Sequence, residues 1–429
     1  MKRLFEAAAY EPQPGNYWAT TRPATDWPPL AGPVQTDVAI IGGGFTGLNA
    51  ALSLAQNGVL AHVFEADRPG FGASGRNGGF CCLGGSKLTD SVLARRHGRA
   101  DADLWSQAES AAIDHVARLL QTHEIDADTH SDGEICLAHT ARAARRMAGQ
   151  PGFLTLKELQ ARGLDGPWHG GLHTPKGFAL NPQKYHDGLA KAAQSAGATL
   201  HARSPVTALR PTAKGWQLDT PHGIVTAARV ILATNGYSSD DLPDWLRART
   251  MPVQSSVIVT RPITPNEQQA AGYTATQMAY DSRTLLHYFR LMPNGRFLFG
   301  MRGGLRATPG EQATISRKIR QDFHAMFPAW RDVDITHEWS GLVCLLSGLV
   351  PFVGAVPDHP GLFAAMGYHG NGVAMGSYSG HLIANRLLKR EPGTPAPNFL
   401  SQPPRRFPLG MRRRLLLAPA YWMAERLDM

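Results

Sequence analysis

Three closely spaced glycines are the residues of this chain with the clearest chemistry. Gly42, Gly44 and Gly47 form the pattern Gly-x-Gly-x-x-Gly, and the acid Glu65 follows them. In such a pattern the first glycine permits a tight turn, the second lets the backbone approach a pyrophosphate, and the third lets a helix pack closely on a strand. An acid at this distance accepts hydrogen bonds from the hydroxyl groups of a ribose. These residues therefore predict a bound dinucleotide.

The surrounding sequence supplies the elements that such a site needs. The apolar run at residues 38–41 predicts a buried strand that ends on the glycines, followed by a helix over residues 48–57. A second strand over residues 60–64 ends on Glu65. The alternative is a glycine-rich turn without a ligand, which explains neither the acid nor the second strand. Further predicted contacts of this unit are Phe45, Thr46 and Ala66.

The segment after Glu65 distinguishes between dinucleotides. Residues 70–79 are rich in Gly and leave no room for a large side chain beside a cofactor. They offer backbone amides, a hydroxyl and a guanidinium to anionic oxygens. A nicotinamide enzyme does not need such a loop here, so the sequence favours a flavin. The predicted contacts are Ala73, Ser74, Arg76, Asn77, Gly78 and Gly79.

With these motifs the chain resembles the D-amino-acid-oxidase superfamily of FAD-dependent oxidoreductases, and within it the gamma-glutamylputrescine oxidase-like branch. The resemblance runs from about residue 15 to the C-terminus, and the run from Ser74 to Gly79 is its most specific part. It also includes Tyr17-Trp18, Pro28-Pro29-Leu30, Trp339-Ser340-Gly341-Leu342 and the segment from Gly367 to Val373. It implies non-covalent FAD, with further contacts from Val206, Thr234, Gly236, Gly370, Asn371, Gly372 and Val373.

The chain departs from these relatives at places that concern chemistry. The Ala-Thr-Gly motif beside the cofactor has one inserted residue, Asn235. In the glycine-rich loop the branch has serine and histidine where this chain has His369 and Asn371, the candidate catalytic residues. Amino-acid-oxidising relatives hold the substrate carboxylate with an arginine at the position of Val343. The sequence therefore favours amines over small amino acids as substrates, unless another arginine takes this role. The candidate substrate contacts are Tyr288, Arg290, Arg302 and Trp339.

The expected fold class is α/β (α+β overall), with a Rossmann-like FAD-binding lobe interleaved with a mostly antiparallel-sheet substrate lobe. The length of 429 residues exceeds one ordinary core. On one strand of a predicted hairpin, alternation puts Tyr288 and Arg290 on one face, and the sequence leaves open which face looks toward the flavin. We assign residues 1–35 to an N-terminal surface segment, 36–95, 179–249 and 336–395 to the FAD-binding lobe, 96–178 and 250–335 to the substrate lobe, and 396–429 to a basic amphipathic C-terminal extension.

The resemblance implies oxidation of a primary or secondary amine, with gamma-glutamylputrescine as the leading substrate. The product would be an imine that water hydrolyses to an aldehyde, and the electrons would pass to oxygen. One alternative is a membrane-associated amine or amino-acid dehydrogenase that passes electrons to a quinone. An alternative of another class is a non-catalytic FAD-binding subunit, and a homo-oligomer is compatible with each.

Composition and charge limit the partners. The net charge is +9, and residues 401–429 contain six arginines against two acids. A basic amphipathic segment at residues 405–423 would suit either an anionic membrane surface or packing on the protein itself. The four cysteines show neither a disulfide framework nor metal-ligand spacing, which favours the reducing cytoplasm and no metal. No motif indicates nucleic-acid binding.

Overall fold

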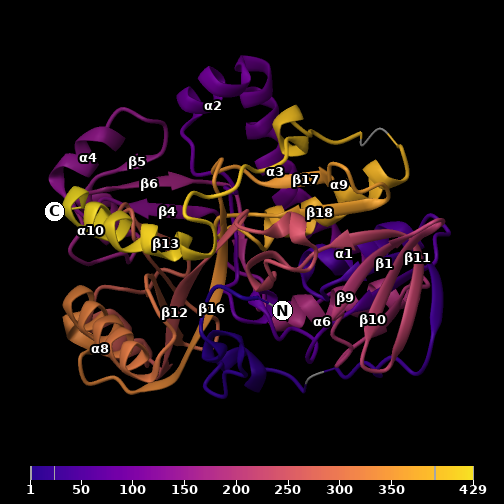
Figure 1. Ribbon diagram of the computed structural model, residues 1–429. Helices are drawn as coiled ribbons and strands as arrows, with labels where there is room; N and C mark the ends of the chain where they lie inside the picture. Colours follow the sequence, from indigo (N-terminus) through magenta and orange to yellow (C-terminus); the bar gives the residue numbers. More distant parts are fainter. Residues whose placement is uncertain (1, 24, 391–392, 429) are drawn as a thin grey trace.

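The chain folds into two large sheets that lie side by side (Figure 1). The computed structural model describes residues 2–23, 25–390 and 393–428. The first sheet has the order β17-β18-β11-β1-β2-β8, and β10 and β9 continue from β11 on a branch. Its strands β18, β11, β1, β2 and β8 run parallel. The strands are β1 (Val34–Ile41), β2 (Ala61–Phe64), β8 (Thr199–His201), β9 (Ala208–Thr212), β10 (Gly215–Thr220), β11 (Gly223–Leu232), β17 (Phe352–Ala355) and β18 (Leu362–Met366).

The second sheet has the order β16-β12-β15-β14-β13-β4-β6-β5. Its pairs are antiparallel except for β13 with β4. The strands are β4 (Glu134–Leu137), β5 (Phe153–Leu154), β6 (Gly171–Thr174), β12 (Thr250–Pro262), β13 (Met278–Asp281), β14 (His287–Leu291), β15 (Arg296–Arg302) and β16 (Ile335–Leu346). Because the two sheets draw on alternating stretches of sequence, the predicted interleaved fold class is confirmed.

Helices cover one face of the first sheet, and the alternation along β1 explains why both of its faces are apolar. Val38 and Ile40 lie in a core with helices α1, α3, α6 and α9, whereas Ala39 and Ile41 lie in a separate core on the other face. None of the described helices is long and apolar enough to cross a membrane. The helices are α1 (Phe45–Ala55), α2 (Asp90–His97), α3 (Arg99–Thr122), α4 (Ala141–Met147), α5 (Leu156–Ala161), α6 (Pro182–Ser195), α7 (Pro265–Ala270), α8 (Pro309–Met326), α9 (Ala374–Leu387) and α10 (Leu417–Leu427).

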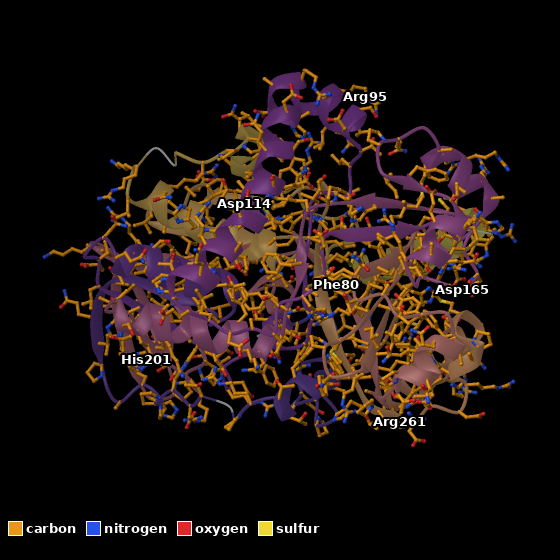
Figure 2. All side chains as sticks on the ribbon, turned by 180° about the vertical axis from the view of Figure 1, so that it is seen from behind. Phe80, Arg95, Asp114, Asp165, His201 and Arg261 are labelled. Atoms are coloured by element: carbon orange, nitrogen blue, oxygen red, sulfur yellow. The ribbon has the colours of Figure 1, made fainter. Side chains whose placement is uncertain are left out.

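The second sheet packs one face on helix α8 through an aromatic core. Phe289 of β14 and Phe297 of β15 are buried there, and both contact the ring of Phe327, which follows α8. Tyr288 therefore lies on the opposite face, toward the first lobe, because neighbouring side chains of a strand point to opposite faces. Phe80 of the short strand β3 (Phe80–Cys81), which pairs with β7 (Phe178–Ala179), packs its ring edge-on against Tyr288 at 5.6 Å. Phe80 lies near the centre of the molecule (Figure 2).

Strand β11 runs without a break from Gly223 to Leu232, because it pairs with β10 over its first half and with β1 from Val225 onward. Two expected lobe assignments need correction. Helix α3 falls in a segment assigned to the substrate lobe, yet its apolar residues share the core of the first sheet. Strand β16 begins near residue 336, where the FAD-binding lobe was expected to resume, but it pairs with β12 of the second sheet.

The N-terminal segment is more than a surface cover. Trp18 and Trp27 are among its fully buried side chains, at 1% and 0% exposure, because Trp18 packs on the second sheet and Trp27 lies in the core of the first. The indole N–H of Trp18 donates to the Asn77 carbonyl at 2.8 Å. A Cβ on Gly43 would lie 2.7 Å from the ring of Trp27. The N-terminal segment thus supports the loops that follow β1 and β2.

Candidate functional site

A cavity of about 550 Å³ lies between the two lobes. Its first-lobe end is formed where β1, β2 and β11 finish, which is the edge at which parallel sheets bind ligands. Its second-lobe end lies against β12, β14 and β15. The first-lobe lining includes Gly42, Gly44, Phe45, Thr46, Glu65, Ala66, Val206 and Thr234, and the second-lobe lining includes Cys82, Lys87, Glu134, Ser255, Tyr280, Leu286, Tyr288 and Arg302.

The glycine fingerprint builds the entry to helix α1 as its pattern predicts. Gly42 has a positive φ of 107°, and a Cβ on Gly47 would lie 2.0 Å from the Gly42 carbonyl oxygen. The helix has Gly44 as its N-cap, so no side chain caps it from that position. Instead the Phe45 N–H donates to Ser74 Oγ at 2.9 Å. The first turn of α1 therefore opens on the cavity with its positive end, which suits a pyrophosphate.

Glu65 is held at the end of β2 by backbone donors. Its carboxylate accepts hydrogen bonds from the Gly43 N–H at 2.9 Å and the Asp67 N–H at 3.1 Å. Burial nevertheless raises the pKa of Glu65, because the donors offset only part of the cost of removing the charge from water. A carboxylate fixed beside the fingerprint is the group that an adenosine ribose requires.

The loop at residues 70–79 has a different role from the one expected for two of its members. The Arg76 guanidinium donates to the carbonyls of Phe71 at 2.7 Å, Glu11 at 2.9 Å and Ser340 at 3.4 Å. Arg76 therefore ties three segments together through three of its five N–H donors, and it also lines the cavity. The Asn77 side-chain amide donates to the Ala73 and Ser74 carbonyls, both at 3.0 Å, and so shapes the loop.

A second helix also directs its N-terminus into the cavity. The loop from Gly370 to Val373 lines the cavity and leads into α9, which has no side-chain cap and no acid in its first turn. Asn371 donates to the Leu83 carbonyl at 2.6 Å and to Cys82 Sγ at 3.2 Å, which fixes this loop against the segment after β3. Two helix N-termini whose N-cap residues provide no side-chain cap face one cavity, and they fit a ligand with two electron-rich regions, as FAD has.

His369 does not line the cavity, contrary to its expected catalytic role. Its imidazole is 1% exposed and bonds to the Gly85 carbonyl at 2.7 Å and to the Leu346 N–H at 3.2 Å. Burial lowers its pKa to about 4, so the ring is neutral and accepts one bond while it donates the other. His369 therefore has the structural role of joining β16 to the segment before Lys87.

The four candidate substrate residues divide into two groups. Tyr288 and Arg302 line the cavity, and the Tyr288 hydroxyl lies 3.0 Å from Ser255 Oγ. Arg290 is away from it, with its guanidinium bonded to the Gly78 carbonyl at 3.0 Å and to the Leu180 carbonyl at 2.8 Å. Trp339 is 2% exposed and donates its indole N–H to the Arg76 carbonyl. Arg290 and Trp339 are thus buried side chains that support the flavin loop through hydrogen bonds to its carbonyl groups.

The remaining predicted contacts also divide into residues that line the cavity and residues that do not. Three glycines are absent from the lining: Gly47 packs on Gly42, Gly79 faces the Leu180 carbonyl, and Gly236 faces Leu342. Asn235, the inserted residue, accepts the Gly367 N–H at 2.9 Å and so joins the end of β11 to the loop after β18. The predicted contacts that line the cavity besides those already named are Ala73, Ser74, Asn77, Gly78, Gly370, Asn371, Gly372 and Val373.

Sequence reasoning missed Lys87 and Glu134, two ionisable residues of the second-lobe end. Lys87 comes eight residues after the predicted flavin loop, in a run of glycines that signals close approach to a ligand. Glu134 is 5% exposed, and burial raises its pKa to about 7. In the sequence, only the glycine before Glu134 indicated a turn. An acid at the first position of a strand has no pattern that identifies it as a cavity residue in a single sequence.

Comparisons with known proteins agree with this geometry. The chain matches the family described as FAD dependent oxidoreductase over residues 37–386. It is 32% identical over 432 residues to the probable oxidoreductase OrdL of Rhizobium meliloti (strain 1021), covering 96% of this chain and 97% of that protein. It is 28% identical over 364 residues to the gamma-glutamylputrescine oxidoreductase of Escherichia coli (strain K12), covering 82% and 84%.

Solved structures share the fold. The crystal structure of glycine oxidase from Geobacillus kaustophilus superposes with a TM-score of 0.69 at 23% identity, over 84% of this chain and 96% of that one. The L-proline dehydrogenase from P. horikoshii gives a TM-score of 0.68 at 18% identity, over 85% and 96%. The fingerprint, Glu65 and the two helix ends provide the contacts that FAD needs. The chain therefore belongs to the family of FAD-dependent oxidoreductases, with FAD as its cofactor and amines or amino acids as its substrate class.

Proposed function

We propose that this protein oxidises a primary or secondary amine of the gamma-glutamylputrescine type to an imine, which water hydrolyses to an aldehyde. The observation that carries the proposal is Val343, which lines the cavity where amino-acid-oxidising relatives place an arginine. A small amino acid would have its carboxylate against this apolar side chain, at a large desolvation cost. The relative named gamma-glutamylputrescine oxidoreductase supports the same substrate type.

FAD, when bound, supplies the two-electron acceptor for the hydride that leaves the carbon next to the amine nitrogen. The protein's own residues bind and orient the amine, and they exclude water from it. The ring of Tyr288 and the loop held by Asn371 limit the space in which the amine can lie. The amine must be neutral to react, and the cations Lys87 and Arg302 at this end of the cavity disfavour a protonated amine close to them. We propose that oxygen then receives the electrons.

The test is turnover in air with gamma-glutamylputrescine. We expect one aldehyde and one hydrogen peroxide for each substrate molecule consumed, because two electrons leave the amine and two reduce oxygen. A panel of putrescine, glycine and proline provides the comparison. Faster turnover of glycine or proline than of gamma-glutamylputrescine would contradict the proposed substrate.

A quinone-linked dehydrogenase is the second candidate, and one observation favours it. The last part of the chain exposes Leu415 at 66%, Trp422 at 56% and Met423 at 56%, which would suit contact with a membrane that holds quinones. Turnover with a quinone dye without air, together with no peroxide in air, would support this candidate.

A protein that holds FAD tightly but is reduced by no amine would support a non-catalytic subunit. Cytoplasmic location and the oligomeric state remain predictions.

A further inference from the structure

A carboxylate stands apart from the others at the second-lobe end of the cavity. Among the described residues that line the cavity, the acids are Glu65, Asp67 and Glu134. Glu65 and Asp67 lie together just after β2, beside the glycine fingerprint, whereas Glu134 is the first residue of β4 in the second sheet. Of the described lining residues, Glu134 therefore supplies the negative charge that the second sheet can present to a substrate.

The pairing of the strands shows which way Glu134 points. Ile135 and Leu137 of β4 lie in the aromatic core on the far face of the second sheet, so Glu134, which alternates with them, lies on the face toward the cavity. On the next two strands Tyr280 and Tyr288 pair with each other, and both line the cavity. Glu134 therefore belongs to the same wall of the cavity as the candidate substrate residue Tyr288.

Glu134 also lies near the loop that opens α9. Its strand partner Met278 shares a small apolar cluster with Cys82, and Cys82 donates its S–H to the Glu134 carboxylate. The Cys82 sulfur in turn accepts the side-chain N–H of Asn371 at 3.2 Å. The loop that Asn371 fixes and the ring of Tyr288 limit the space for the amine, so Glu134 lies beside that space.

The Glu134 carboxylate is buried without a cationic partner. Its side chain is 5% exposed, yet across residues 2–23, 25–390 and 393–428 it accepts no hydrogen bond from a guanidinium, an ammonium or a backbone N–H. The ionisable groups that interact with it are Cys82, Glu109, Cys136 and Tyr280, and none of these is a cation. An ionised carboxylate in such a place is costly, and a cation that binds beside it removes that cost.

The charges on the second sheet divide the cavity wall. Arg302 lies on β15 and Glu134 on β4, and the strands β14 and β13 separate them, so the two strands lie three strand spacings or about 14 Å apart. A protonated amine is repelled by Arg302 and attracted by Glu134. Because burial raises the pKa of Glu134 to about 7, this carboxylate is ionised at pH 8 and accepts a proton more readily than an exposed acid does.

We propose that Glu134 binds the ammonium group of the substrate amine and accepts its proton. The N–H bond that breaks leaves its electron pair on nitrogen, and the proton forms an O–H bond on the Glu134 carboxylate. The neutral amine can then lose hydride from the neighbouring carbon. This inference rests on the proposed function, because it assigns a proton acceptor to the amine that is oxidised, and it makes Glu134 a catalytic residue.

The first test is the pH dependence of flavin reduction without air, measured by rapid mixing with gamma-glutamylputrescine, or with putrescine if that substrate fails. At pH 8, flavin reduction in Glu134→Gln should be about a hundredfold slower than in the unchanged protein, which is the scale of a lost general base. The difference should shrink toward pH 10, because an alkyl amine with a pKa of about 10.4 is then increasingly neutral in solution. Glu134→Asp, which keeps the carboxylate, should lose less. A loss of equal size at every pH would overturn the inference.

Glu109→Gln is the matched control. Glu109 of α3 is a second acid whose pKa burial raises to about 7, but it does not line the cavity. Its loss should leave flavin reduction at pH 8 unchanged, because Glu134 is ionised at that pH with or without the charge of Glu109. The FAD content of each variant is read from its visible spectrum. A loss as large as that of Glu134→Gln would overturn the inference, since removal of either acid would then act through the structure.

A binding measurement separates this inference from the proposed function. tert-Butylammonium has no hydrogen on the carbon beside its nitrogen, so it cannot be oxidised, and tert-butanol is a neutral molecule of the same shape. By calorimetry at pH 8 the FAD-loaded protein should bind the cation more tightly than the alcohol, and Glu134→Gln should weaken the cation about tenfold or more without affecting the alcohol. Equal binding of the two would overturn the inference. If the cation binds as expected and putrescine but not gamma-glutamylputrescine reduces the flavin, the proposed substrate is wrong and Glu134 keeps its role.

Discussion

The Phe45 N–H donates to Ser74 Oγ at 2.9 Å, and this bond joins the first turn of α1 to the flavin loop. A Cβ on Gly44 would lie 2.8 Å from the same oxygen, so the fingerprint and the loop fit together only with glycine at this position. Two motifs that are separate in the sequence thus form one wall of the cavity. The FAD site depends on this contact as much as on either motif alone.

Glu65→Ala should yield protein depleted of FAD. The change removes the acceptor for two backbone N–H groups and for a ribose, and a charged hydrogen bond contributes about 1.5–3 kcal/mol. FAD affinity should therefore fall about tenfold to a hundredfold, as measured from the absorbance of the purified protein. Asp103→Ala, which removes an exposed carboxylate on α3, is the control. Normal FAD content in Glu65→Ala would show that this acid does not hold the cofactor.

Asn371→Ala should retain FAD but lose turnover. Its side chain fixes the glycine-rich loop to Leu83 and Cys82, and loss of buried hydrogen bonds costs about 1–3 kcal/mol each. We expect kcat to fall about tenfold or more, measured in steady state with the FAD content matched. Asn385→Ala, at the other end of α9, should keep normal kcat. Equal kcat in the two variants would remove Asn371 from the site.

Arg413→Ala should destabilise the protein far more than Arg412→Ala does. The Arg413 guanidinium bonds to both oxygens of Asp240 and to the Thr250 carbonyl, and it is 1% exposed. Its removal leaves a buried carboxylate unpaired, a loss of about 3–5 kcal/mol. Arg412 is exposed, so its loss should change the free energy of unfolding by less than about 0.5 kcal/mol. Urea unfolding measures both, and similar midpoints would contradict the structure.

Glu134→Gln should stabilise the protein above pH 7 but not near pH 5. Burial raises the pKa of Glu134 from 4.5 to about 7, so between these values the folded state keeps a proton that the unfolded state has lost. Stability therefore falls as pH rises through this window. Glutamine cannot ionise, and the variant should gain up to about 3 kcal/mol at pH 8. Parallel unfolding midpoints of both proteins across pH 5–8 would disprove the raised pKa.

The sequence predicted the elements that carry local signals. The glycine fingerprint and the hairpin that carries Tyr288 and Arg290 were both predicted from short stretches of sequence. What it could not predict was set by tertiary packing. The imidazole of His369 resembles a catalytic group until its two backbone partners are seen. Arg290 and Arg302 lie on the neighbouring strands β14 and β15, but only Arg302 lines the cavity.

The C-terminal segment shows the same limit. A run of three arginines predicted a basic surface, but Arg413 pairs with Asp240 and Arg414 with Glu6, which leaves Arg412 exposed. These partners lie far away in the sequence, so no local pattern indicates them. Helix α10 instead lies beside β13 (Figure 1), and Thr284 donates its N–H to Asp428 at 2.7 Å. Packing on the protein itself therefore uses part of this segment.

The central claim is best tested by the visible spectrum of the purified protein, recorded without air before and after addition of gamma-glutamylputrescine. The account predicts a yellow protein whose visible flavin absorbance is lost when the amine is added, because the bound flavin is then reduced. A colourless protein, or a yellow one that this amine leaves unchanged, would contradict it.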